Sequence, residues 1–240
     1  MAQESAPPVE LVIFDCDGVL VDSERIAVRV NARVFEAMGC RFTDAEMIEL
    51  FVGCSAEDFH RQVEERLGRP LERDWHRPYE HFYEEAFAAE LTAVDGIADV
   101  LEALATPFCL ASNNNHAGIR QNLTTTGLYD RFAGRVFCAS DVARGKPAPD
   151  LFLHAARTMG ADPARCVVVE DSPHGVRAAR AAGMRSFGYA GGLTAAHRLE
   201  GPGTVVFGTM RDLPKLLASV GADTSADASG GADAGPASTG

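Results

Sequence analysis

Two aspartates separated by one residue follow an apolar run near the start of the chain. The run is Leu11-Val-Ile-Phe14, and Asp15-Cys-Asp17-Gly18 comes directly after it. Four consecutive apolar residues predict a strand buried on both faces, as in a parallel sheet, and Gly18 allows a sharp turn. Carboxylates at such a strand end need a counter-charge, because a bare buried anion is costly. The stretch predicts either a divalent cation site or an acidic turn that faces water.

Polar side chains also follow two later apolar runs. Ser112 and Asn113 come after one of them, and Glu170 and Asp171 after another. Lys146 is one of only two lysines and lies between two prolines and a glycine, just before a predicted helix. In open α/β sheets ligands bind outside the carboxyl ends of the strands. The four acidic groups can hold a hard cation, while the lysine and main-chain amides can hold phosphate oxygens, which favours a metal-bound phosphate.

Strands and helices must alternate to bring these residues together. Apolar runs predict strands at 11–14, 108–111, 136–139, 166–169, 185–188 and 204–207, with helical stretches between them from about residue 94 onwards. Residues 24–90 contain only helical patterns, including the capping box Thr43-Asp-Ala-Glu46. Such alternation predicts an α/β fold with a parallel sheet and right-handed crossovers. The all-helical block is inserted directly after the first strand.

Composition and charge narrow the class of protein. The chain has 240 residues and a formal net charge of -12, which argues against nucleic acid or an anionic membrane as a partner. The N-terminus has no signal-peptide pattern and no run reaches membrane-spanning length, so we expect a cytoplasmic protein. Six cysteines without a C-x-x-C pair are expected to be reduced and mostly buried. The oligomeric state cannot be predicted from the chain.

These motifs resemble those of the haloacid dehalogenase superfamily, in the same order and at similar spacing. Asp15-Cys-Asp17-Gly-Val-Leu-Val-Asp22-Ser23 is similar to its first motif and Ser112 to its second. Lys146 in Gly-Lys-Pro-Ala-Pro-Asp150 is similar to the third, and Glu170-Asp171-Ser172 to the fourth. The resemblance implies a Rossmann-like core at 1–23 and 91–220. It also implies a helical cap of the C1 type at 24–90, as in the β-phosphoglucomutase and sugar-phosphate phosphatase branch. Residues 221–240 are expected to be a disordered tail.

The resemblance also implies a role for each motif residue. Asp15 would be the nucleophile and Asp17 the general acid and base. Mg²⁺ would be bound by the Asp15 carboxylate, the Asp17 main-chain carbonyl and Asp171, and by Glu170 directly or through water. Ser112, the Asn113 amide and Lys146 would hold the phosphoryl oxygens. We therefore expect a Mg²⁺-dependent phosphatase that acts on a sugar phosphate or sugar-acid phosphate through an aspartyl-phosphate.

Three other activities of the superfamily are less well supported. Its dehalogenases lack the second aspartate of the first motif, which is present here as Asp17, and its phosphonoacetaldehyde hydrolases use a cap lysine, whereas residues 24–90 contain none. β-Phosphoglucomutase is the main alternative. Its cap cations correspond to Val52 and Ala56, its histidine after the first motif to Ala27, and its lysine after the second to Asn115. A non-catalytic binding module is the second alternative, although every catalytic position is present.

Overall fold

The strands form one parallel sheet, as the sequence predicts. The computed structural model describes residues 9–54 and 56–220, so the predicted tail at 221–240 lies outside the described residues. The strands are β1 (Leu11–Phe14), β2 (Phe108–Ser112), β3 (Val136–Cys138), β4 (Cys166–Glu170), β5 (Arg185–Tyr189) and β6 (Thr204–Phe207). Their order is β3-β2-β1-β4-β5-β6, with every neighbouring pair parallel. The expected α/β, Rossmann-like fold is confirmed.

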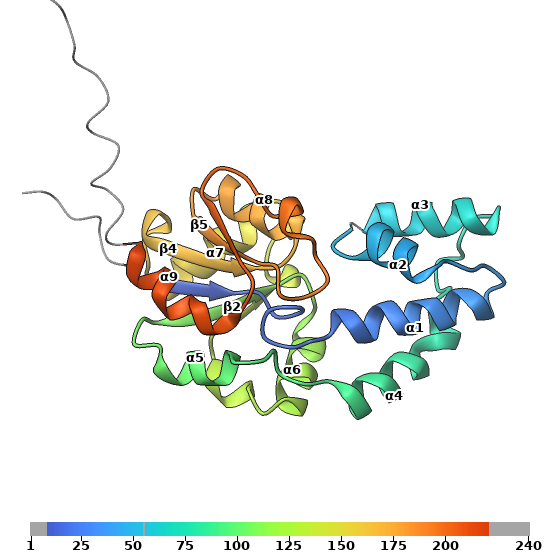
Figure 1. Ribbon diagram of the computed structural model, residues 1–240, viewed down its shortest axis with the longest axis horizontal. Coiled ribbons are helices and arrows are strands. Elements are labelled where there is room, and N and C mark those ends of the chain that lie inside the picture. The colour runs from blue at the N-terminus through green and yellow to red at the C-terminus, as the bar shows by residue number, and fades with distance from the viewer. Residues whose placement is uncertain (1–8, 55, 221–240) are drawn as a thin grey trace, which may run out of the picture.

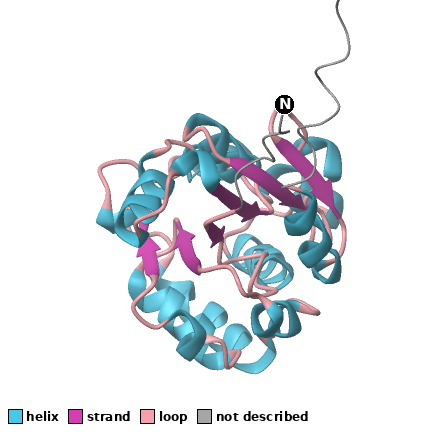
Figure 2. Ribbon diagram, turned by 90° about the vertical axis from the view of Figure 1, so that its left-hand side faces the viewer, coloured by secondary structure: helices cyan, strands magenta, loops and turns pink. Residues whose placement is uncertain are grey.

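Helices cover both faces of this sheet (Figure 2). In the core these are α5 (Ile97–Ala103), α6 (His116–Thr125), α7 (Asp150–Met159), α8 (Pro173–Ala181) and α9 (Leu213–Ser219). The alternation of side chains along β1 sets the two layers. Val12 and Phe14 belong to the apolar cluster that includes residues of α5, α6 and α9, whereas Leu11 and Ile13 belong to the cluster of α7 and α8. The buried strand β1 therefore lies at the centre of the molecule.

Four helices follow β1 in the sequence, before α5 and the remaining strands. They are α1 (Glu24–Ala37), α2 (Asp44–Phe51), α3 (Ala56–Leu67) and α4 (Glu80–Glu90), and they project to one side of the sheet (Figure 1). This helical insertion has a small apolar cluster of its own around Phe35, Met47 and Val63. Thr43 caps α2 through the predicted capping box. The boundaries of core and cap at residues 23 and 91 stay a prediction.

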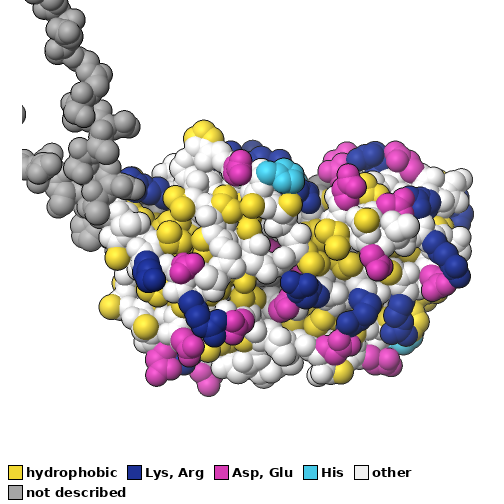
Figure 3. Space-filling model, viewed as in Figure 1, with side chains coloured by type: hydrophobic (Ala, Val, Ile, Leu, Met, Phe, Trp, Pro, Cys, Tyr) yellow, Lys and Arg dark blue, Asp and Glu magenta, His cyan; other side chains and the backbone are white. Residues whose placement is uncertain are grey.

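The insertion touches the core through the turn that follows α2. The carbonyl of Val52 accepts a hydrogen bond from Arg198 Nη1 at 3.0 Å, across 146 residues of sequence. A Cβ on Gly53 would lie 2.9 Å from Pro173 Cδ, so only glycine lets the two chains approach this closely. Acidic and basic side chains are interspersed over both parts of the molecule on the face shown in Figure 3. None of the described helices is long and apolar enough to cross a membrane.

Candidate active site

The carboxyl ends of β1, β2 and β4 meet at one edge of the sheet. Register pairs Phe14 with Leu110 on β2 and with Val169 on β4, and the Asp15 N–H donates to the Val169 carbonyl at 3.0 Å. The polar residues that follow these strands are consequently neighbours in space. Asp15, Ser112, Glu170 and Asp171 are all buried. The strand ends thus bring together side chains that are up to 156 residues apart in the sequence.

Lys146 forms the centre of the site. Its Nζ donates to Asp15 Oδ1 at 2.6 Å and to Glu170 Oε1 at 2.8 Å, and its side chain is only 3% exposed. Burial alone would lower the pKa of this lysine, but the two carboxylates outweigh it and raise the pKa above its usual range. An ammonium group has three donors, and these two bonds leave one for another anion.

The loop that carries Lys146 is held by the residue after the second strand. The Asn113 side chain receives a hydrogen bond from the Lys146 N–H at 2.8 Å and donates to the Lys146 carbonyl at 3.0 Å. This paired contact fixes the lysine backbone across 33 residues of sequence. The sequence predicts a role for the Asn113 main-chain amide in phosphate binding, and the side chain has this positioning role in addition.

Asp17 faces two amides that the sequence analysis does not identify. Asn114 Nδ2 donates to its Oδ2 at 3.3 Å and Asn122 Nδ2 to its Oδ1 at 3.2 Å. Burial raises the pKa of the Asp17 carboxyl, although hydrogen bonds from Ser23 and Asn114 act in the opposite direction. Asn122 is buried on the apolar face of α6 beside Leu123. A polar residue among apolar helix positions is the signal by which it could have been found.

Burial also controls the protonation of Asp15. It raises the pKa of Asp15 to about 7, and the carboxylates of Glu170 and Asp17 add to the rise. Lys146 lowers the pKa of Asp15 but does not offset the effect of burial. A further positive charge is needed to keep this carboxyl fully ionised near neutral pH.

Asp15, Glu170 and Asp171 form a cluster suited to a hard cation. One carboxylate oxygen from each lies within 4.8 Å of the others. Among the described residues, Asp171 Oδ2 is buried without a hydrogen-bond partner, and burial raises the pKa of this carboxyl well above its usual value. Such an orphaned oxygen is costly unless a ligand satisfies it. The donor set is oxygen only, which fits Mg²⁺.

Glycine is required at two positions around this cluster. Gly18 has a φ of +78°, and a Cβ there would lie 2.0 Å from Asp171 Oδ2. A Cβ on Gly175 would lie 1.7 Å from Glu170 Oε1. Glu170 itself has both oxygens engaged, since Oε2 accepts from the Ser172 N–H at 2.7 Å and from the Ser172 hydroxyl at 2.8 Å. Glu170 therefore positions Lys146 and the turn after β4, besides facing the cluster.

Glu24 is a further acidic residue of the site that the sequence analysis does not identify. It begins α1, and its carboxyl interacts with that of Asp171, whose pKa it raises. Burial raises the pKa of Glu24 to about 7, and its Oε2 is buried without a partner among the described residues. Together with Asp15, Asp17, Glu170 and Asp171 it gives the site five carboxyl groups, whereas Lys146 supplies a single ammonium. This excess of acidic groups is the strongest argument for a divalent cation.

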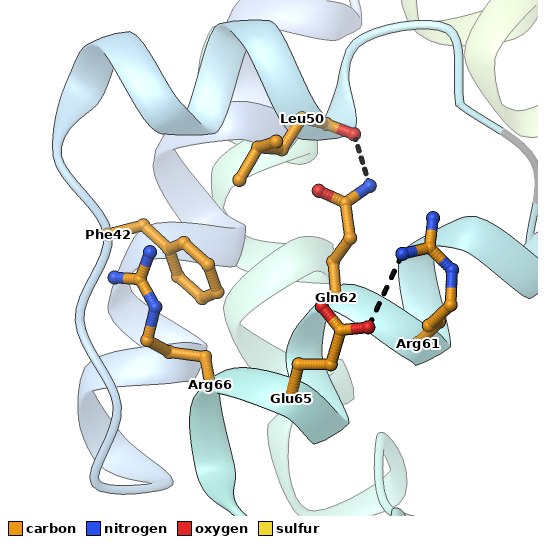
Figure 4. Close-up of a pocket in the computed structure, with 6 residues that line it drawn as sticks. All are labelled: Phe42, Leu50, Arg61, Gln62, Glu65 and Arg66. Atoms are coloured by element: carbon orange, nitrogen blue, oxygen red, sulfur yellow. Dashed lines mark hydrogen bonds and ion pairs between the residues drawn. The ribbon is translucent and has the colours of Figure 1, made fainter.

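A cavity of about 490 Å³ lies apart from these residues, between α2 and α3 of the insertion. Figure 4 shows its lining, in which Gln62 donates to the Leu50 carbonyl at 3.0 Å and Arg61 pairs with Glu65. None of the motif residues lines it. A second cavity, of about 360 Å³, lies between the insertion and the core and includes Gly53, Pro173 and Arg198. It adjoins the turn after β4, where the insertion and the core meet.

Two positions that correspond to mutase residues have other structural tasks in this chain. Asn115 caps α6, because its side chain accepts the Gly118 N–H at 2.9 Å. Val52 is buried and offers only its carbonyl to Arg198. Neither position carries a cation, as the sequence indicates. The side chain of Ala56 is outside the described part of the structure.

The family model and the relatives that match this chain agree with one another. The family model "haloacid dehalogenase-like hydrolase" matches residues 9–183. The chain is 31% identical to the 6-phosphogluconate phosphatase of Escherichia coli (strain K12) over 75% of this chain and 81% of that protein. It is 31% identical to a probable pseudouridine-5'-phosphatase of Drosophila melanogaster, over 77% and 83% of the two chains.

Solved structures agree with the fold. A haloacid dehalogenase-like protein of unknown function from Agrobacterium tumefaciens superposes with a TM-score of 0.79 at 39% identity, over 88% of this chain and 98% of that one. A putative β-phosphoglucomutase from Thermotoga maritima superposes with a TM-score of 0.72 at 25% identity, over 88% and 99%. Both similarities extend over the sheet and the helical insertion together.

Proposed function

The chain belongs to the haloacid dehalogenase-like hydrolases and is a phosphoric monoester hydrolase that acts on phosphorylated metabolites, and on this premise we propose its substrate class and chemistry. The substrate is a small sugar phosphate or sugar-acid phosphate, and the reaction requires Mg²⁺ and passes through an aspartyl-phosphate. The observation that supports this most is Lys146 Nζ, 2.6 Å from Asp15 and 2.8 Å from Glu170, beside the unpartnered oxygen of Asp171.

Asp15 is the nucleophile in this proposal. One of its carboxylate oxygens attacks the phosphorus, the bond from phosphorus to the substrate oxygen breaks, and Asp15 carries the phosphoryl group as an acyl phosphate. Asp17 gives its proton to the leaving oxygen and later takes one from the water that hydrolyses the acyl phosphate. The raised pKa of Asp17 and the two amides that orient it support this acid role.

Three groups stabilise the phosphoryl oxygens as charge develops. They are the unused donor of Lys146, the Ser112 hydroxyl and the Asn113 main-chain N–H. Asp15, Asp171 and the Asp17 carbonyl would hold Mg²⁺, with Glu170 bound directly or through water, and the ion would supply positive charge to the carboxylates and the phosphoryl group. Glu170 also positions Lys146, which keeps the ammonium close to the nucleophile.

The relatives narrow the substrate only to a class. One of them is a 6-phosphogluconate phosphatase and another a putative β-phosphoglucomutase. The missing cations at Val52 and Asn115 favour hydrolysis over transfer to a second sugar site. A binding module without catalysis would not need Asp15, Asp17 and Lys146 in this arrangement.

A substrate screen tests the proposal. Phosphate release is measured with Mg²⁺ for 6-phosphogluconate, glucose 6-phosphate, β-glucose 1-phosphate and phosphoglycolate. 6-Phosphogluconate and glucose 6-phosphate differ at carbon 1, so the ratio of their rates of phosphate release tests the preference for a sugar acid. We expect free phosphate that disappears with a chelator. An isomerised sugar phosphate without free phosphate would establish the mutase instead, and binding without turnover would establish the binding module.

A further inference from the structure

A second group of metal-ligating side chains lies outside the carboxylate cluster, after β2 and β3. His116 begins α6, Cys138 ends β3, and Asp141 ends the short 3₁₀ turn Ala139–Asp141. One ligand atom from each lies within 4.8 Å of the others, and His116 Nε2 is 2.9 Å from Asp141 Oδ1. We propose that these three residues form a second metal site, for Zn²⁺ or another cation that prefers sulfur and nitrogen, and that it joins the two loops that carry the phosphate-binding residues.

The donor atoms fit such a cation and not the one proposed for the carboxylate cluster. Thiolate, imidazole and carboxylate are the ligands of zinc sites, and three protein ligands with one open position are a common arrangement. Metal–ligand bonds of about 2.0–2.3 Å in a tetrahedral site hold donor atoms about 3.3–3.8 Å apart. The ligand atoms of His116, Cys138 and Asp141 lie within 4.8 Å of one another, which is close to that spacing. Mg²⁺ prefers oxygen ligands alone, so the two sites select different ions.

Two polar groups contact the sulfur of Cys138. Its Sγ accepts the Asp141 main-chain N–H and lies 2.9 Å from the Ser140 hydroxyl. Both groups can donate to a sulfur that binds a metal ion, and such donors matter because Cys138 is fully buried. These contacts distinguish it from Cys109, a cysteine that is buried within β2 among apolar side chains.

The Asp141 carboxylate is also held in place by a hydrogen bond. Its Oδ2 accepts the Cys138 N–H at 2.8 Å, and this leaves Oδ1 directed at His116. Hydrogen bonds that fix the ligands from behind are typical of metal sites. The His116 side chain is 53% exposed and that of Asp141 is 26% exposed, so an ion can enter from the solvent side with the sulfur beneath it.

The site would act on the same two loops as the phosphate-binding residues. His116 follows Ser112 and Asn113, while Cys138 and Asp141 precede Lys146. The Asn113 side chain already joins these loops by two hydrogen bonds to Lys146. A metal ion bound to His116, Cys138 and Asp141 adds a second link between them. It should therefore raise the melting temperature and hold Lys146 in place, without touching the substrate.

Cobalt binding to the full-length protein tests the proposal, because a thiolate bound to Co²⁺ gives a charge-transfer absorption band in the near ultraviolet. We expect one equivalent of Co²⁺ to produce this band and Zn²⁺ to abolish it. With the carboxylate cluster saturated by Mg²⁺, His116→Asn and Cys138→Ser should lose the band, and Zn²⁺ should no longer raise their melting temperatures. Cys54→Ser is the matched control, since Cys54 is a partly exposed thiol of the insertion, and it should keep the band.

Several outcomes would overturn the proposal. A missing charge-transfer band, a band that survives in His116→Asn, or a band lost in Cys54→Ser would each do so. His116 is exposed at a helix start, so His116→Asn is expected to fold even if the buried Cys138→Ser does not. Asp171→Asn should abolish phosphate release while it leaves the cobalt band intact. The two sites can therefore fail independently of each other.

Discussion

Replacing Lys146 with methionine tests the central contact of the site. The substitution removes an ammonium that lies 2.6 Å from Asp15 and 2.8 Å from Glu170 and leaves a side chain of similar length. Removing one partner of a buried ion pair costs about 3–5 kcal/mol, because the remaining charge is uncompensated. At about 2–4 °C per kcal/mol for a chain of this size, the melting temperature should fall by about 6–20 °C.

The rate should fall as well. Loss of one donor to the developing charge reduces the rate about 100- to 1000-fold. Lys146 also lowers the pKa of Asp15, so the substitution raises that pKa above about 7 and moves the rising limb of the rate profile to higher pH. Because Asp15 can take up a proton below that pKa, the loss of stability should be smaller at pH 5 than at pH 8.

The assay compares two lysine variants. Lys215, the other lysine of the chain, is exposed on α9, and Lys215→Met is the matched control for loss of one positive charge. Phosphate release and thermal unfolding are measured at pH 5, 6, 7 and 8 with saturating Mg²⁺. A Lys146→Met protein with activity and melting temperature near those of Lys215→Met would refute the assignment of Lys146 to the site.

Three further predictions concern the carboxylates. Asp15→Asn should abolish turnover while circular dichroism shows a folded protein, and Asp17→Asn should slow turnover about 100- to 10,000-fold; retained activity in either would show that the roles are misassigned. Gly18→Ala should weaken Mg²⁺ activation about 10- to 100-fold in a titration of rate against Mg²⁺, because a Cβ there lies 2.0 Å from Asp171 Oδ2. Without divalent cations, burial raises the pKa of Asp15 and of Glu24 to about 7. The folded state therefore binds these protons more tightly than the unfolded state does. As a result, the protein loses stability as pH rises from about 4 to 7. The gain in melting temperature on adding Mg²⁺ should therefore grow from pH 5 to pH 8, and a gain independent of pH would contradict this.

The sheet and its polar edge were predictable because they follow from local patterns. Apolar runs such as Cys166–Val169 mark strands buried on both faces, and parallel strands place their carboxyl ends together. The register of β1 between β2 and β4 then brings Asp15, Ser112 and Glu170 to one edge. The expected fold is confirmed, and Lys146 contacts Asp15, while its assignment to phosphate binding stays a prediction.

The residues that sequence analysis missed depend on distances that no local pattern contains. Asn114 and Asn122 reach Asp17 across 97 and 105 residues, through side-chain directions set by α6 and its preceding loop. Glu24 follows the first motif closely, but its contact with Asp171 depends on the angle at which α1 leaves the sheet. His116 and Asp141 are likewise 25 residues apart and become neighbours only because β2 and β3 are paired.

The charge balance of the site links its chemistry to its folding. Burial of Asp15, Glu24 and Asp171 raises the pKa of each, so the folded protein tends to hold protons on carboxyl groups that the proposed metal site and mechanism need ionised. Lys146 supplies one positive charge, and the orphaned oxygen of Asp171 requires another. A bound divalent cation meets both needs at once, because it displaces the protons from the carboxyls and satisfies that oxygen. In the proposed mechanism, the ion that prepares Asp15 for attack should therefore also stabilise the fold.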